Sequence, residues 1–125
     1  MKKTVIGARL IFGALFVIFG LNGFLNFIPI PPPPPAAGQF LGALGATGYM
    51  FPVIKGIEVI AGVMVLAGVF VPLALTLLAP IVVNIVLYHL ILAPAGAALP
   101  LLLLALGLFL AWNEREKFIP MLRMK

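Results

Sequence analysis

The sequence contains no cysteine, one histidine and only three acidic residues among 125. The lack of cysteine excludes disulfides, iron–sulfur ligation and thiolate nucleophiles within this chain. A single histidine, His89, cannot supply a self-contained bis-histidine haem site and does not favour a zinc site. We therefore predict no metal site and no cofactor bound through cysteine.

Charged residues are also scarce, and apolar residues take their place. Only 9% of the residues are charged, 64% are hydrophobic, and the mean hydropathy is +1.28. A soluble domain carries about 25% charged residues and needs polar side chains to cover its surface. The composition therefore predicts an integral membrane protein with one domain, built from four spanning helices of about 20 residues each.

Four apolar stretches predict the spanning helices, at approximately residues 5–27, 52–70, 72–92 and 97–112. Between the first two lies an outer loop, residues 28–50, which opens with IPIPPPPP. Consecutive prolines block a helix and favour polyproline II. Residues 36–50 are glycine-rich and too short to span, which predicts a short interfacial or re-entrant helix. The predicted fold class is all-α: an integral membrane four-helix bundle in one transmembrane domain, residues 1–125, with a tail at 113–125.

The net charge of +5 does not indicate nucleic-acid binding, because the basic residues flank the predicted spans. All of them except Lys55 lie near the two ends: Lys2, Lys3, Arg9, Arg115, Lys117, Arg123 and Lys125. Positive charge beside spans marks the cytoplasmic side. We therefore predict a multi-pass protein of a bacterial-type cytoplasmic (inner) membrane, with both termini in the cytoplasm. Arg9 is expected to snorkel to lipid headgroups, with a buried ion partner as the alternative.

Few polar residues interrupt the spans, and Lys55 and Glu58 are the only charged ones between Arg9 and Glu114. Their spacing of three places them on one helix face, where they can pair. Counted from the outer helix ends at about 1.5 Å per residue, polar side chains of three spans fall in the same outer half of the bilayer. We therefore predict an outward-open polar pocket lined by Asn22, Gln39, Lys55, Glu58, Asn84, Tyr88 and His89. The alternative is that these groups only hold helices together.

Such a pocket favours binding over catalysis. Glu58 and His89 can relay a proton, because histidine titrates near neutrality. Lys55 and His89 can hydrogen-bond a quinone carbonyl or another small amphiphile. No nucleophile accompanied by a base and an orienting residue is recognisable, so we assign no catalytic residue. Gly13 and Gly20 lie on one face of the first span, which predicts a closely packed neighbouring helix.

A set of residues along most of the chain resembles the DoxX-like family of small four-helix membrane proteins. The set comprises Arg9 with Gly13, Asn22-Gly23, PVIKGIEVIAG at residues 52–62, Gly68, Pro72, and PIVVNIVLYH at residues 80–89. The resemblance implies a four-helix bundle and a membrane part of a redox or stress-protection assembly. The family takes its name from a subunit associated with thiosulfate:quinone oxidoreduction, and distant relatives look like chaperones for membrane proteins. It also implies functional roles for Lys55, Glu58, Asn84 and His89.

Three functional hypotheses remain open. The first is an accessory protein of DoxX type, whose pocket binds a quinone or similar lipophilic molecule for a redox partner such as an oxidoreductase subunit. The second is a ligand-free scaffold or assembly factor, which binds another membrane protein through its glycine-rich helix faces. The third is a small-molecule or proton pathway, which needs a homo-oligomer because one four-helix chain has little room. Independent catalysis ranks below an accessory role.

Overall fold

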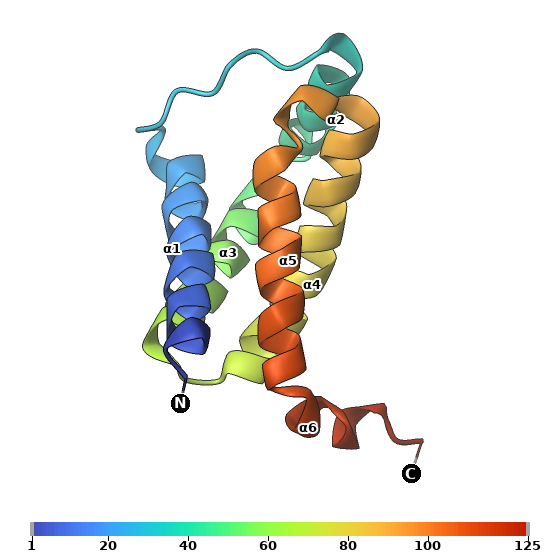
Figure 1. Cartoon of the computed structure of the whole chain (residues 1–125). Helices are drawn as coiled ribbons and strands as arrows, with labels where there is room; N and C mark the ends of the chain where they lie inside the picture. Colours follow the sequence, from blue (N-terminus) through green and yellow to red (C-terminus); the bar gives the residue numbers. More distant parts are fainter. Residues whose placement is uncertain (1, 125) are drawn as a thin grey trace.

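The computed structural model describes residues 2–124 and is all-helical, with no strand in that range (Figure 1). The long helices are α1 (Lys3–Leu25), α2 (Pro35–Ala46), α3 (Met50–Ala67), α4 (Val71–Leu87) and α5 (Ala98–Asn113). α4 continues directly into the π-helix η1 (Tyr88–Leu92). The short segments η2 (Pro94–Gly96), α6 (Arg115–Phe118) and η3 (Pro120–Leu122) complete the chain. The all-α prediction is confirmed.

Three helical segments are long and apolar enough to cross a membrane: Lys3–Leu25, Met50–Ala67 and the continuous Val71–Leu92. A fourth is obtained if α5 and the segment Arg115–Leu122, which meet at 76°, form one bent span. These helices indicate a membrane protein. The ends of α1, α3, the continuous helix Val71–Leu92 and α5 on its own lie within three residues of the ends expected from the apolar stretches.

Proline and glycine set several helix ends. α2 begins at Pro35, the last residue of the proline run, because proline fits the first helical position, where no N–H partner is needed. α3 ends at Gly68, whose φ of 75° is the left-handed conformation that glycine adopts without a Cβ penalty. There the Val69 N–H donates to the Met64 carbonyl oxygen at 3.0 Å, which closes a Schellman motif.

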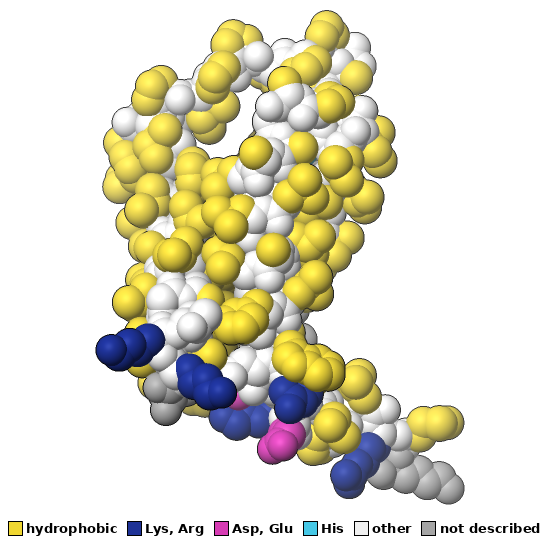
Figure 2. All heavy atoms as spheres, in the orientation of Figure 1, with side chains coloured by type: hydrophobic (Ala, Val, Ile, Leu, Met, Phe, Trp, Pro, Cys, Tyr) yellow, Lys and Arg dark blue, Asp and Glu magenta, His cyan; other side chains and the backbone are white. Residues whose placement is uncertain are grey.

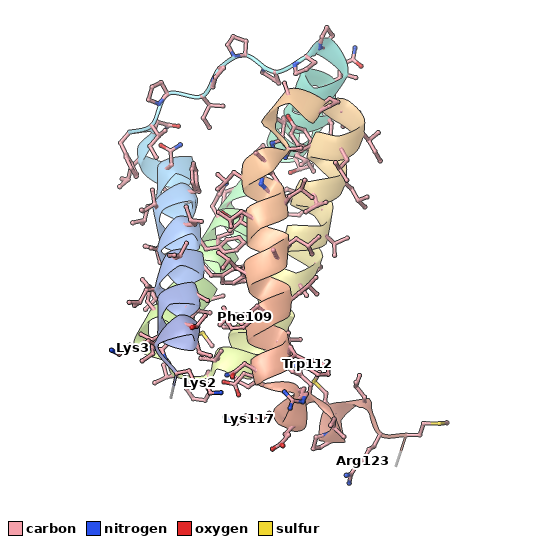
Figure 3. All side chains as sticks on the ribbon, viewed as in Figure 1. Lys2, Lys3, Phe109, Trp112, Lys117 and Arg123 are labelled. Carbon is pink, nitrogen blue, oxygen red and sulfur yellow. The ribbon has the colours of Figure 1, made fainter. Side chains whose placement is uncertain are left out.

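The two ends of the molecule differ in chemistry. α1 begins and α5 ends at the same end, whereas residues 28–34 cross the opposite end on their way to α2 (Figure 1). The end where α1 begins and α5 ends carries Lys2, Lys3, Lys117 and Arg123, and we call it the charged end (Figure 3). The other is the proline end. Between them the visible surface is mostly apolar (Figure 2).

The tightest helix contact is between α1 and α3, and glycine makes it close. A Cβ on Gly13 would lie 2.9 Å from the Gly62 carbonyl oxygen, so the two backbones meet directly. This confirms the expected close neighbour of α1. α4 packs against α3 and α5, and α5 also packs against α1. The largest fully buried side chains come one each from α1, α3, α4 and α5: Phe12, Val65, Leu78 and Leu110.

Candidate functional site

The two charged residues of α3 form an ion pair. Lys55 Nζ lies 3.3 Å from Glu58 Oε1. The Glu58 side chain is 3% exposed and that of Lys55 is 25% exposed, so the acid is enclosed while the ammonium remains accessible. A charge inside a membrane-spanning segment is costly unless it is paired. Each member of the pair therefore stabilises the other.

Glycines of α1 make room for this ion pair. A Cβ on Gly20 would lie 3.1 Å from the Glu58 Cβ, and one on Gly23 would overlap the Lys55 side chain. The α1 backbone thus lies directly against both side chains. α1 and α3 together enclose the Glu58 carboxylate, and larger residues at either glycine would displace the pair.

Asn22 is buried, but it serves the backbone of the proline run. Its Oδ1 accepts a hydrogen bond from the Ile28 N–H at 2.7 Å, and its Nδ2 donates to the Ile28 carbonyl oxygen at 3.3 Å. The amide uses both of its polar atoms in these bonds. Asn22 therefore fixes the point at which the chain leaves α1 for the proline end.

Tyr88 and His89 form an aromatic cluster with Phe40 of α2. The Tyr88 ring centroid lies 4.9 Å from that of His89 and 5.8 Å from that of Phe40. His89 Nδ1 lies 2.9 Å from the Ile85 carbonyl oxygen. A carbonyl only accepts, so Nδ1 carries the proton in this assignment, and Nε2 of the neutral ring is left as an acceptor. The ring edge with Nε2 lies beside Gly96 of η2.

Gln39 and Asn84 both lie on the surface. Gln39 is exposed on α2, and Asn84 is exposed on α4. Neither side chain has a hydrogen-bond partner within residues 2–124. The structure therefore shows no hydrogen bond from either amide side chain to another member of the predicted set.

Four of the seven predicted residues form two groups at the proline end. One is the Lys55–Glu58 pair against α1, and the other is the Tyr88–His89 cluster at the end of α4. α2 packs against both α3 and η1 and so connects the groups. No hydrogen bond or ion pair joins them within residues 2–124. Below the proline run, the visible surface is hollowed between α1 and α5 (Figure 2).

Arg9 has a role that the sequence did not reveal. Its Nε donates to the Val65 carbonyl oxygen at 2.9 Å, and its Nη2 donates to the Leu66 carbonyl oxygen at 3.4 Å. The last carbonyls of a helix lack partners within the helix and carry partial negative charge. Arg9 therefore caps α3, and within residues 2–124 it forms no ion pair with an acid.

An apolar groove lies elsewhere in the molecule. It has a volume of about 360 Å³, runs between α4 and α5 toward the charged end, and is lined by residues such as Leu75, Leu78, Leu104, Gly107 and Phe118. None of the predicted polar residues lines it. Residues 2–124 contain no group of three or more His, Asp or Glu residues placed to hold a metal ion.

Comparison of the chain with protein-family models, curated proteins and solved structures finds no match. Function is therefore inferred from the chain's own residues. The feature with the clearest chemistry is the enclosed Glu58 carboxylate with its partly exposed ammonium partner. The imidazole of His89 at the end of α4 is the second.

Proposed function

We propose that this chain is a small membrane accessory protein of the DoxX-like type. In this proposal α1, α3, α4 and α5 form a four-helix bundle in a bacterial-type cytoplasmic membrane, with both termini in the cytoplasm. α2 is the interfacial or re-entrant helix of the outer loop. The quoted sequence resemblance and the apolar helices support it.

The proposed activity is binding of a quinone-like or other small lipophilic ligand at the proline end, on behalf of a redox or stress-protection partner. The observation that carries it is the Lys55–Glu58 pair. The enclosed Glu58 carboxylate orients the Lys55 ammonium, which retains N–H donors for a carbonyl oxygen. The hollow below the proline run offers a route for a ligand from the lipid (Figure 2).

His89 complements this donor. Its Nδ1 lies in hydrogen-bond distance of the Ile85 carbonyl oxygen, so the Nε2 of a neutral ring is available to accept a hydrogen bond from a ligand. A quinone presents carbonyl acceptors and a quinol presents hydroxyl donors. The Lys55 ammonium can donate to a quinone carbonyl, and His89 Nε2 can accept from a quinol hydroxyl. The Tyr88 ring beside His89 supplies an aromatic surface for the ligand ring.

An accessory role fits these contacts better than catalysis. Lys55–Glu58 is the only hydrogen bond between two side chains within residues 2–124. A nucleophile held by a base and an orienting group needs at least two such contacts. The ligand is therefore bound for a partner protein, and we assign no catalytic residue.

Ligand binding is tested on purified protein in lipid nanodiscs with short-chain ubiquinone and menaquinone analogues, by calorimetric titration. Lys55→Met removes the donor, so affinity should fall about tenfold, as expected for a hydrogen bond to a charged group. Gln39→Ala is the matched control, because Gln39 is polar and exposed on α2 and lies outside both groups; its affinity should not change. Absence of binding, or equal loss in both variants, overturns the proposal.

The second candidate function is a ligand-free scaffold or assembly factor, and one observation favours it. Gly13, Gly20 and Gly62 already lie in the α1–α3 contact, so they are not available to another protein. By contrast, a Cβ added to Gly42 of α2 would have no neighbour within 4 Å. α2 buries only Ala37, so its face is open to another membrane protein. A lipid extract free of quinone, with a membrane protein that co-purifies and is lost on Gly42→Leu, favours this function.

A further inference from the structure

Asn84 is an exposed amide in the middle of a membrane-spanning segment. Within Val71–Leu92 it lies roughly 20 Å from one end and 12 Å from the other, at about 1.5 Å per residue. Lipid tails offer no hydrogen bonds, so an amide at this depth needs a protein partner. The chain's own residues supply none to Asn84 within residues 2–124.

The residues around Asn84 form a continuous seam on the exposed side of α4 and η1. They recur at alternating intervals of four and three residues, and all are exposed: Leu73, Leu77, Pro80, Asn84, Leu87 and Ile91. This is the heptad spacing with which two helices interlock at a small crossing angle. We call these six residues the Asn84 seam.

A second polar group lies on the same side of α4. Pro80 has no N–H, so the Thr76 carbonyl loses its usual partner one turn later. Thr76 is exposed, and its hydroxyl already donates to the Pro72 carbonyl oxygen at 2.8 Å. Besides the Asn84 amide, the exposed face of α4 therefore carries a carbonyl whose usual helical donor is missing.

We propose that the Asn84 seam is the interface with a second copy of this chain, related by a two-fold axis along the membrane normal. Copies inserted in the same direction present Asn84 at the same depth, so each amide meets Asn84 of the partner subunit. An amide both donates and accepts, and two of them satisfy each other. Asparagine at one core position of a heptad seam favours two-stranded pairing and fixes its register. This interface does not depend on the ligand proposed above.

Cysteine cross-linking tests the interface directly, because the chain has no cysteine of its own. Leu87→Cys places a thiol in the seam, next to Asn84. Leu102→Cys is the matched control on α5, with 45% exposure against 48% for Leu87. In purified protein reconstituted in vesicles, oxidation should link Leu87→Cys into a dimer and leave Leu102→Cys monomeric. Equal linking of both variants, or no linking of Leu87→Cys, overturns the proposal.

The role of the amide itself is measured by energy transfer between labelled copies diluted in vesicles. Asn84→Leu should raise the dimer dissociation constant about tenfold, since an interhelical hydrogen bond is lost. Asn84→Gln keeps the amide and should recover part of the affinity, and Gln39→Leu, an exposed amide outside the seam, should have no effect. An unchanged constant for Asn84→Leu overturns the proposal. So does a seam that cross-links only to a different membrane protein in native membranes.

Discussion

Arg9 holds the charged end of α3, although it belongs to α1. Its guanidinium reaches the Val65 and Leu66 carbonyls because Gly68 has no side chain; a Cβ there would lie 2.9 Å from the Arg9 Cζ. We predict that Arg9→Met lowers the free energy of unfolding by about 1.5–3 kcal/mol, the range for hydrogen bonds to a charged group. Unfolding in mixed detergent micelles measures it.

Arg9→Lys provides the control for that experiment. Lysine keeps the positive charge near the negative end of α3 but lacks the planar guanidinium that reaches two carbonyls. Its stability should fall between those of the wild type and Arg9→Met. If all three proteins unfold alike, Arg9 contributes nothing as a cap.

At the scale of helices, the α1–α3 contact depends on where glycine lies. Gly13 faces the Gly62 backbone, whereas Gly7, two turns earlier on the same helix, has no neighbour within 4 Å of a Cβ. We predict that Gly13→Ala destabilises the protein by about 1–3 kcal/mol through overpacking. Gly7→Ala should be neutral or stabilising by up to about 1 kcal/mol, because alanine is the better helix former. Thermal unfolding of both variants in one detergent compares them.

The helices were predictable because each span is a long apolar run. The hydropathy pattern placed their ends within three residues, and the prolines predicted the break before α2. The pairing of Lys55 with Glu58 followed from their spacing on one face. These features depend on neighbours along the chain, which the sequence states directly.

The orientation of each helix was not predictable in the same way. In water a helix turns its apolar side inward, but in lipid the inner and outer faces are equally apolar. Nothing in the sequence therefore indicated that Asn84 lies exposed or that Asn22 bonds to Ile28. The Arg9 cap depends on the last carbonyls of α3, which come near only after α1 and α3 pack.

At the scale of the whole molecule, the described charged residues other than Lys55 and Glu58 lie at one end. Apart from Lys55, the described basic side chains belong to residues 2–9 and 115–123, at the charged end (Figures 2 and 3). Basic residues beside spans stay on the cytoplasmic side. The proline end should then face outward. This orientation requires an even number of spans, so it depends on whether α5 crosses the membrane.

α5 is short for a membrane span. Its 16 residues extend only about 24 Å at 1.5 Å per residue, whereas the hydrocarbon core is about 30 Å thick. The chain bends directly after it, and Trp112 and Arg115 there pack together with 4.5 Å between guanidinium and ring. Local thinning of the bilayer or tethering by Trp112 can accommodate such a short helix.

Single cysteines decide the orientation and the number of spans together. We predict that a membrane-impermeant maleimide labels Pro32→Cys in intact cells, because Pro32 is exposed at the proline end. Met124→Cys, which is fully exposed and leaves every charge in place, should react only after the membrane is permeabilised. Labelling of both positions in intact cells would mean that α5 does not cross, since the chain then crosses an odd number of times. Labelling of Met124→Cys alone would reverse the orientation, and with it the side from which a ligand reaches Lys55.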